Sequence, residues 1–554
     1  MEEFSFKNEI LLNYFNEFSS RIVSETGISS DKYHFGKIVL QSLKDDPDFV
    51  MQIDGGTGES ETNGSVLRKS IKCATAFKNL GLKIGDVMVL MAPSHLDLAV
   101  PFYAAMFLGI TTAAIDRTLG VNDLKDTFNT NRPKIIFCQS EKVEDIQKAT
   151  ALLGLEPKIV TFDHHPDTIT LSEIMEKHGE NIAIEDFRAA DFDPEEIVGY
   201  LVATSGTTGK PKAAIITHKN LASSGIYLCG FAKKIPPTRA KLLVAPLQWL
   251  SSLLSYIMSP YYKYTRIQTS HEMTADHTLE LIQKYQPTFM IISPTKMTTL
   301  VKAAKKENVD LSSFEAIYIG GSAVPTKLIE ELRGMVLPTA IVVDRHGLSE
   351  IGSTTFESAN SPNGSSGKPY AHLQYKLVDL DSGEEINEPN RHGELWLKAP
   401  GDIKGYYNNP QANAEVLTED KWFKTGDMMY RDEQWNFFFV ERIKLLLKYR
   451  GRKISPVELE GVILQHPGVR DVAVTSIPDE ECGDLPVACV VLLPGVEVTA
   501  QEIKDLVKEK LTEVKQLEGG VIFLNELPLT SSMKLHRRKL KEIAITQLKN
   551  QVAV

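Results

Sequence analysis

Apolar runs and polar stretches alternate along the chain at two different lengths. In the first third, Val66 to Leu80 has apolar positions at helical spacing. The runs Val87 to Ala92, Ile135 to Cys138 and Lys158 to Phe162 have the length of strands. Alternation of helices with short apolar strands predicts an α/β fold with largely parallel sheets.

The longest uncharged run, Leu98 to Ile115, has 18 residues, which is the lower limit for a membrane span. Pro101 and Gly109 interrupt it. We therefore expect a buried helix that stops at Gly109, followed by a strand from Ile110 to Ile115, and no transmembrane segment.

Further apolar runs predict strands in the middle of the chain and a small α+β domain at its end. The middle strands are expected at Leu242–Leu250, where the strand runs into a loop, at Tyr285–Pro294 and Phe314–Ser322, and from Ile341 onward. In the last hundred residues we expect helices at Pro456–His466 and Gln501–Leu511, and strands at Val472–Ser476, Val487–Leu493 and Gly520–Leu524.

Length and charge narrow the class of protein. A chain of 554 residues is too long for one ordinary core, so two or more domains are expected. The hydrophobic and charged contents, 42% and 24%, are typical of a soluble globular enzyme. A net charge of −11 argues against general nucleic-acid binding.

Cysteines and chain ends indicate a cytoplasmic protein. The five cysteines form no C-x-x-C pair, which favours a reducing compartment and neither a disulfide framework nor a zinc site. The first residues, MEEFSFKNEI, have no signal-peptide pattern. The chain ends in Val552-Ala553-Val554 and lacks the S-K-L address that a peroxisomal home would need.

The stretch Tyr200 to Asn220, YLVATSGTTGKPKAAIITHKN, is the chemically richest part of the chain. A predicted strand, Ile197 to Ala203, enters it, and Ala213 to Ile216 is the predicted returning strand. Thr217 is suited to cap a helix that follows. Between the strands lie hydroxyl residues, glycines and lysines: Thr204, Ser205, Gly206, Thr207, Thr208, Gly209, Lys210 and Lys212.

Such a loop is suited to bind phosphate. Glycines let the backbone approach a ligand, and free N–H groups and hydroxyls suit phosphate oxygens. The spacing differs from the G-x-x-x-x-G-K-[ST] of P-loop NTPases, because Gly206 and Gly209 are three apart and Pro211 follows the lysine. On these residues alone, a polar hairpin loop stays open as an alternative.

The string TSGTTGKPK resembles the phosphate-loop signature of the adenylate-forming superfamily, which includes acyl-CoA synthetases, 4-coumarate–CoA ligases and beetle luciferases. The resemblance continues through six ordered motifs, roughly from Gly85 to Leu540. It implies that the loop holds the β- and γ-phosphates of ATP.

Two later motifs imply an adenine pocket and a metal ligand. FEAIYIGGS ends in paired glycines, which alone would predict a tight turn, and IVVDRHGLSEIG is similar to the family's Y-G-x-[TS]-E. In the second motif Ser349 would contact phosphate or carboxylate, Glu350 would bind Mg²⁺, and His346 replaces the usual tyrosine. The implied adenine-pocket residues are Gly320, Gly321, Ser322, Ala323, His346 and Gly347.

Motifs nearer the C-terminus imply a ribose contact and a hinge. Asp427 in WFKTGD would bind the ribose hydroxyls with Arg442 as its partner, and Gly393 to Tyr406 would be framework. Lys444 would be the pivot between domains. On the basic strand and turn that follow, the residues implied for the coenzyme A half-reaction are Lys448 and Gly451.

Four positions carry the remaining implications and departures. In LPLTSSMKLHRRKL, Lys534 aligns with the catalytic lysine, although Met533 replaces the usual glycine. In PLQWLSS, Trp249 stands where the family often has a histidine, and would be an apolar wall of the acyl pocket. Glu441 stands where an aspartate is usual.

The resemblance implies an adenylation domain at residues 1–441 and a mobile C-terminal domain at 442–554. It also implies an ATP-dependent acyl-CoA synthetase for a medium- or long-chain fatty acid or an arylpropenoate. This enzyme would use ATP, Mg²⁺ and coenzyme A, and release AMP and pyrophosphate. A luciferase-type monooxygenase and a catalytically impaired acyl- or nucleotide-binding relative stay open as alternatives, as does the oligomeric state.

Overall fold

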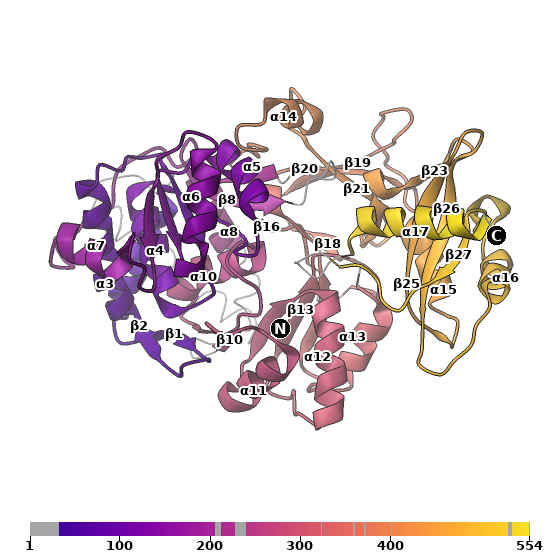
Figure 1. Cartoon of the computed structure of the whole chain (residues 1–554), viewed down its shortest axis with the longest axis horizontal. Helices are drawn as coiled ribbons and strands as arrows, with labels where there is room; N and C mark the ends of the chain where they lie inside the picture. The colour runs from indigo at the N-terminus through magenta and orange to yellow at the C-terminus, as the bar shows by residue number, and fades with distance from the viewer. Residues whose placement is uncertain are drawn as a thin grey trace. The chain divides into compact units, whose positions relative to one another are not determined.

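The computed structural model of the chain describes residues 33–204, 212–227, 240–322, 324–357, 361–370, 373–399, 401–529 and 535–552 (Figure 1). The chain divides into two compact units. The first unit comprises Met1–Gly364, Lys368–Gln374 and Leu397–Phe423, and the second comprises Ser365–Gly367, Tyr375–Trp396 and Lys424–Val554. The predicted domain boundary at residue 441 stays a prediction.

One seven-stranded sheet of the first unit has the strand order β7-β6-β5-β3-β4-β8-β9. In that order its strands are β7 (Ile169–Thr170), β6 (Lys158–Thr161), β5 (Ile135–Cys138), β3 (Val87–Met91), β4 (Thr111–Ala114), β8 (Val198–Thr204) and β9 (Lys212–Thr217). Neighbours are parallel except for β9, which returns antiparallel to β8 at the edge. Every residue of β3, β4 and β5 is buried, which explains why these strands are uninterrupted apolar runs.

Helices accompany this sheet, and one of them, α4, lies in the uncharged run from Leu98 to Ile115. They are α2 (Phe35–Asp45), α3 (Asn63–Asn79), α4 (Ala99–Leu108), α5 (Val121–Asn131), α6 (Val143–Ala151), α7 (Leu171–His178) and α8 (His218–Tyr227). All ten residues of α4 are buried, and Gly109 ends it at φ +69°, as predicted. Within the described ranges, no helix combines the length and apolar character that crossing a membrane requires.

The second seven-stranded sheet has the order β14-β13-β12-β10-β11-β1-β2. Its strands are β14 (Ile341–Arg345), β13 (Ala316–Gly320), β12 (Phe289–Ile292), β10 (Ala240–Leu242), β11 (Thr265–Gln268), β1 (Val50–Asp54) and β2 (Ser60–Thr62). Its helices are α10 (Leu250–Tyr262), α11 (Ala275–Tyr285), α12 (Pro294–Glu307) and α13 (Thr326–Arg333). Helices α11, α12 and α13 lie along this sheet and bury one apolar face each (Figure 1).

The run from Leu242 to Leu250 is a strand end that continues into a loop, as predicted: β10 ends at Leu242, and residues 243–249 form a loop that contains Pro246. The prediction for Tyr285–Pro294 was wrong at both ends, because Tyr285 ends α11 and Pro294 begins α12. Proline at the first helical position favours that start.

Short elements complete the first unit. They are β15 (Gly347–Leu348), β16 (Ser353–Thr354), β17 (Phe356–Glu357), β18 (Lys368–Pro369), α14 (Pro410–Val416) and the 3₁₀ turns η2 (Leu96–Leu98), η3 (Ser140–Lys142) and η4 (Ser349–Ile351).

The second unit contains two sheets. The four-stranded sheet, which extends slightly into the first unit, has the order β19 (Gln374–Val378), β20 (Gly393–Lys398), β21 (Phe423–Arg431) and β22 (Phe437–Arg442). The five-stranded sheet comprises β24 (Arg452–Ile454), β23 (Leu447–Tyr449), β26 (Gly483–Leu492), β25 (Val469–Asp479) and β27 (Gly520–Phe523). The remaining elements are α15 (Pro456–Ile463), α16 (Ala500–Lys510), α17 (Arg537–Val552), η5 (Ile443–Leu445) and η6 (Glu513–Lys515).

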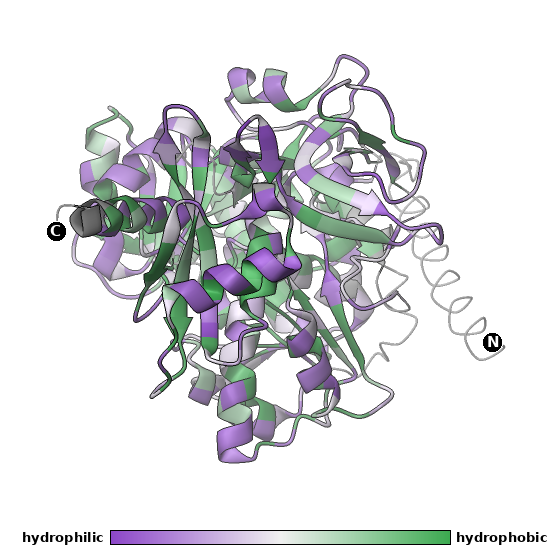
Figure 2. Ribbon diagram, turned by 90° about the vertical axis from the view of Figure 1, so that its right-hand side faces the viewer, coloured by the Kyte–Doolittle hydropathy of each residue, from purple (hydrophilic) through white to green (hydrophobic). Residues whose placement is uncertain are grey.

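The hydropathy of the residues agrees with this arrangement of sheets and helices. Strands are mostly hydrophobic, whereas many helices carry hydrophilic and hydrophobic residues on different faces (Figure 2). The predicted fold class, α/β with largely parallel sheets and a small α+β C-terminal domain, is confirmed.

Candidate functional site

Strands β8 and β9 hold the two ends of the predicted phosphate loop. Thr204 and Lys212 are paired across these strands, and the Thr204 hydroxyl donates to the Lys212 carbonyl at 3.3 Å. After β9, Thr217 Oγ1 accepts the N–H of Asn220 at 3.1 Å, which is the predicted helix cap. The centre of the loop, Ser205, Gly206, Thr207, Thr208, Gly209 and Lys210, lies outside the described residues.

A segment from far along the chain, residues 405–407, extends the sheet beyond β9. Ile215 N–H donates to the Gly405 carbonyl at 2.9 Å, and Tyr407 N–H donates to the Ala213 carbonyl at 2.8 Å. These bonds place the G-Y dipeptide of the sequence beside the returning strand of the phosphate loop.

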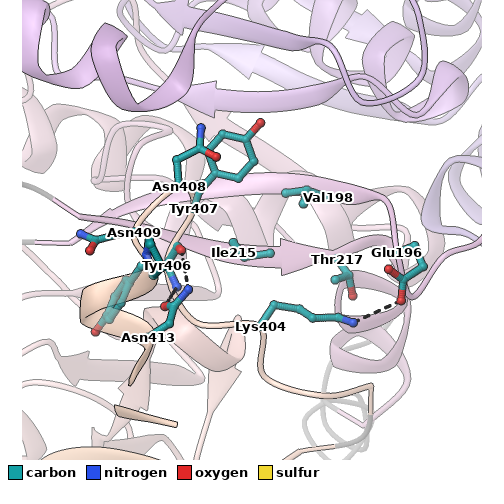
Figure 3. Close-up of a pocket in the computed structure, with 11 residues that line it drawn as sticks. Glu196, Val198, Ile215, Thr217, Lys404, Tyr406, Tyr407, Asn408, Asn409 and Asn413 are labelled. Atoms are coloured by element: carbon teal, nitrogen blue, oxygen red, sulfur yellow. Dashed lines mark hydrogen bonds and ion pairs between the residues drawn. The ribbon is translucent and has the colours of Figure 1, made fainter. Parts of the chain in front are cut away.

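Asn413 of α14 fixes the backbone of Tyr406 from the other side. Tyr406 N–H donates to Asn413 Oδ1 at 2.6 Å, and Asn413 Nδ2 donates to the Tyr406 carbonyl at 2.9 Å (Figure 3). In Figure 3 the rings of Tyr406 and Tyr407 point away from each other, as expected for neighbours on a strand. Tyr407 lines a pocket of about 360 Å³ whose rim includes the Lys404–Glu196 ion pair (3.3 Å).

The side chain of Tyr406 contacts two predicted site residues at once. Its hydroxyl donates to Glu350 Oε1 at 2.8 Å, and Lys212 Nζ lies 4.8 Å from the centroid of its ring. Tyr406 is 8% exposed. We call Lys212, Tyr406 and Glu350 the Tyr406 cluster. Sequence reasoning missed Tyr406 because it treated Gly393 to Tyr406 as framework; the G-Y dipeptide was the available signal.

Glu350 is suited to a magnesium ion that arrives with a nucleotide. Mg²⁺ is usually held by one or two carboxylates together with substrate phosphates. Glu350 supplies one carboxylate that shares the Tyr406 side chain with Lys212, and it lies in η4, which packs on β8 and β9. In the described part of the chain, no group of three or more histidines, cysteines or acidic residues is arranged to hold a metal by itself.

Ser349 begins η4, and Gly352 ends it at φ +63°. A Cβ at Gly352 would lie 3.0 Å from Ile216 of β9, so the close packing of this turn on the strand favours glycine. The same short turn therefore carries both Ser349 and Glu350 to the β9 edge.

The predicted adenine residues meet at one edge of the second sheet. Strands β13 and β14 are parallel, and Gly320 is opposite Arg345, so both strands end together. A Cβ at Gly320 would lie 2.2 Å from the Arg345 carbonyl, which excludes any larger residue. The residues brought to this edge are Gly320, Gly321, Ser322, His346 and Gly347, whereas Ala323 lies outside the described residues.

His346 is held in place by Thr355. The His346 Nδ1 and the Thr355 hydroxyl are hydrogen-bonded, and Thr355 N–H donates to the His346 carbonyl at 3.0 Å. The imidazole therefore has a defined orientation at the strand end.

In the second unit, the predicted ribose pair is formed. Asp427 of β21 is opposite Arg442 of β22, and Arg442 Nε lies 2.8 Å from Asp427 Oδ1. The Asp427 side chain is 1% exposed and that of Arg442 is 45% exposed. Arg442 also donates to the Thr425 carbonyl at 2.8 Å, and Glu394 Oε1 accepts the Gly426 N–H at 3.0 Å. Glu394 of β20 thus supports the part of β21 that carries Asp427.

The predicted hinge and coenzyme A residues follow β22. Lys444 lies in η5, Lys448 is exposed on β23, and Gly451 lies in the turn between β23 and β24. Arg450 and Gly451 have φ values of +47° and +73°, which suits a two-residue hairpin turn with the hand of twisted strands.

Near the predicted hinge, Glu441, which is buried, and Glu460, whose side chain is 15% exposed, lie close to one arginine. Arg537 of α17 lies 3.9 Å from Glu441 Oε2 and 3.6 Å from Glu460 Oε1. Burial raises the pKa of Glu441, and it raises the pKa of Glu460 to about 6. Arg537 opposes both shifts.

Trp249 precedes α10, where its carbonyl accepts the N–H groups of Ser252 and Leu253 at 3.0 Å. The Tyr200 hydroxyl donates to the Leu247 carbonyl at 2.8 Å and so attaches this loop to β8. Lys534 and Met533 lie outside the described residues.

Two family models match the chain. The model described as AMP-binding enzyme matches residues 40–407, and that of the AMP-binding enzyme C-terminal domain matches residues 458–534.

Curated proteins and solved structures are similar along most of the chain. Luciferin 4-monooxygenase of Photuris pensylvanica is 30% identical over 498 residues, covering 88% of this chain and 90% of the relative. 4-Coumarate-CoA ligase 1 of Narcissus pseudonarcissus is 29% identical over 516 residues, covering 91% and 92%. ATP-bound MatB from Rhodopseudomonas palustris superposes with a TM-score of 0.81 over 92% of this chain and 99% of that one; at 21% identity this likeness shows the fold.

Proposed function

Because this chain belongs to the family of AMP-binding enzymes, the adenylate-forming superfamily, we propose that it is an ATP-dependent acyl-CoA synthetase. Its substrate is a medium- or long-chain fatty acid or an arylpropenoate. The observation that carries the proposal is the Tyr406 cluster, in which a phosphate-loop lysine and a lone carboxylate meet on one tyrosine. The Asp427–Arg442 pair supports a ribose contact in the second unit.

The first half-reaction makes an acyl-adenylate. A carboxylate oxygen of the substrate attacks the α-phosphorus of ATP, the bond to the β-phosphate breaks, and pyrophosphate leaves. Fixed cations stabilise the charge that develops in this step. Lys212 and the loop from Ser205 hold the β- and γ-phosphates, and Lys534 contacts the α-phosphate and acyl oxygens. Mg²⁺, when bound at Glu350, supplies additional neutralisation of phosphate charge.

The second half-reaction forms the thioester. The thiol of coenzyme A loses its proton and attacks the acyl carbonyl, the bond to the phosphate oxygen breaks, and AMP leaves. We assign Lys444 as the pivot about which the C-terminal domain rotates between the two half-reactions. Lys448 and Gly451 belong to the face of that domain that serves the second half-reaction. Trp249 forms an apolar wall of the acyl pocket.

A luciferase-type monooxygenase that oxidises its adenylate is the second candidate. The 30% identity to a luciferin 4-monooxygenase favours it. The tryptophan at position 249 favours the ligase, because an indole cannot take up a proton as imidazole does.

Pyrophosphate release from ATP tests the proposal, measured over C8 to C20 fatty acids and cinnamic acids with and without coenzyme A. We expect turnover that requires coenzyme A and peaks at one class of acid. Pyrophosphate without thioester, together with oxygen consumption on a luciferin, would favour the monooxygenase. ATP binding without turnover on any acid would favour a catalytically impaired binding protein.

A further inference from the structure

Tyr406 contacts both charged side chains of the Tyr406 cluster, Lys212 and Glu350. It lies outside the two predicted motifs that contain these residues. We propose that Tyr406 is a positioning residue that keeps Lys212 and Glu350 separate and oriented, so that both stay available to the phosphates and the divalent cation of a bound nucleotide. This inference rests on the proposed function and concerns how its phosphate end is built.

The ring of Tyr406 occupies a fixed position. Its backbone bridges Ala214 of β9, and Asn413 bonds to both its N–H and its carbonyl (Figure 3). The residue is 8% exposed, so the side chain has little room to change rotamer. A tyrosine held in this way can transmit its own geometry to the groups that it contacts.

The phenol orients the Glu350 carboxylate. Its hydroxyl donates to Oε1 at 2.8 Å, and among the described residues no second group hydrogen-bonds to this carboxylate. A neutral donor leaves the negative charge in place, whereas an arginine or lysine at this point would cancel it. Partners of this kind commonly tune metal affinity by 10- to 100-fold, because they orient the ligand oxygen.

The ring face positions Lys212. Its Nζ lies 4.8 Å from the centroid, within the distance for a cation–π contact. In the described part of the chain Lys212 and Glu350 form no ion pair with each other, although both contact Tyr406. Without the ring, the flexible lysine would be free to close on the carboxylate, and each charge would neutralise the other before a nucleotide binds.

Two substitutions separate the two roles. Tyr406→Phe removes the hydroxyl and retains the ring, whereas Tyr406→Leu removes both. Tyr407→Phe is the matched control, since it deletes a hydroxyl from the next residue, whose ring points away from Tyr406 (Figure 3).

The experiment is calorimetric titration of the full chain with ATP, with and without Mg²⁺, in the absence of any carboxylic acid. Mg²⁺ raises the affinity for ATP by a certain factor in the wild type, and we expect this factor to be about tenfold smaller in Tyr406→Phe. The metal-free affinity of this variant for ATP should stay unchanged. Tyr406→Leu should in addition weaken metal-free ATP binding, because Lys212 is then free to pair with Glu350. Tyr407→Phe should bind as the wild type does in both conditions.

A double substitution tests whether Tyr406 acts through Glu350. In a Glu350→Gln background, Tyr406→Phe should have no further effect on the Mg²⁺ dependence. Additive losses would overturn the inference, as would an unchanged Mg²⁺ dependence in Tyr406→Phe. If the wild type binds ATP normally, either of these two results leaves the proposed function standing. A wild type that binds no ATP would overturn the inference and the proposed function together. If Tyr406→Leu does not fold, Tyr406→Phe, which keeps the packed ring, still decides.

Discussion

The proposed ribose pair, Asp427 and Arg442, and the Tyr406 cluster join opposite charges in different ways. Asp427 and Arg442 contact each other directly, 2.8 Å apart, on neighbouring strands. Lys212 and Glu350 each contact a tyrosine instead. A direct pair gives a stable surface for a ligand that does not change during the reaction. Separated charges leave two groups available where phosphate charge develops, so we expect the ribose pair to serve binding and the cluster to serve the chemical step.

The largest expected effect tests the chemical role of the cluster. Glu350→Gln should lower kcat for pyrophosphate release by about 10²- to 10³-fold, because an amide cannot carry the charge that a cation requires. The Tyr406 hydroxyl can still donate to the amide oxygen, so local packing should persist. Steady-state pyrophosphate assays measure the effect. Glu144→Gln, at an exposed position of α6, is the control. If Glu350→Gln releases pyrophosphate nearly as fast as this control, Glu350 has a structural role only.

The second prediction concerns Lys534, which the resemblance places on the α-phosphate. Lys534→Ala should lower adenylation by at least ~10²-fold, while thioester formation from a supplied acyl-adenylate survives. Single-turnover assays of each half-reaction measure the two rates. Lys539→Ala, at an exposed position of the same basic tail, should leave both unchanged. Equal losses in both steps would contradict the assigned division of roles.

A smaller and different effect is expected at the ribose pair. Asp427→Asn should raise KM for ATP by roughly tenfold and leave kcat nearly unchanged, because a hydrogen bond to a charged group is lost equally in ground and transition states. Initial rates over a range of ATP concentrations separate the two constants. A fall in kcat as large as that of Glu350→Gln would remove the distinction between the two arrangements.

The smallest effect extends the comparison to the two units and their response to acid. In the first unit, burial lowers the pKa of His34 from an ordinary 6.5 to about 4, against an opposing hydrogen bond to the Ala190 carbonyl. Burial also lowers the pKa of His218 well below its usual range. These histidines are neutral when folded, so the unfolded chain binds more protons, and stability falls as pH drops from 6.5 toward 4.

The second unit should respond in the opposite direction over part of this range. The pKa of Glu460 is raised from an ordinary 4.5 to about 6, so the folded state binds more protons and gains stability as pH falls from 6 toward 4.5. Hydrogen exchange at pH 7 and 5, corrected for intrinsic rates, measures both. Peptides of α2 and α8 should lose protection while those of α15 do not. His34→Gln should reduce the loss, and parallel changes in both units would contradict the assignment.

The sequence alone determined the family and a large part of the elements. Period and length of apolar runs placed β3, β5, β8, α3, α4 and most of the C-terminal elements within a few residues, because burial dictates those patterns locally. The ends of β12 needed correction, because the predicted run reached into the helices on either side, and helices such as α5, α6 and α17 were not predicted. The ordered motifs identified the adenylate-forming superfamily, and the family models confirm it.

Only the tertiary structure decided which side chains meet. Asp427 and Arg442 were foreseeable as partners, because both stand in matched motifs and face each other across one strand pair. The role of Tyr406 was not, since Lys212, Glu350 and Tyr406 come from three distant segments joined by strand pairing, a tight turn and the Asn413 bonds. Local sequence patterns record what each residue buries or exposes; they do not record which distant residue fills the space beside it, because that depends on how the sheets and their connections pack.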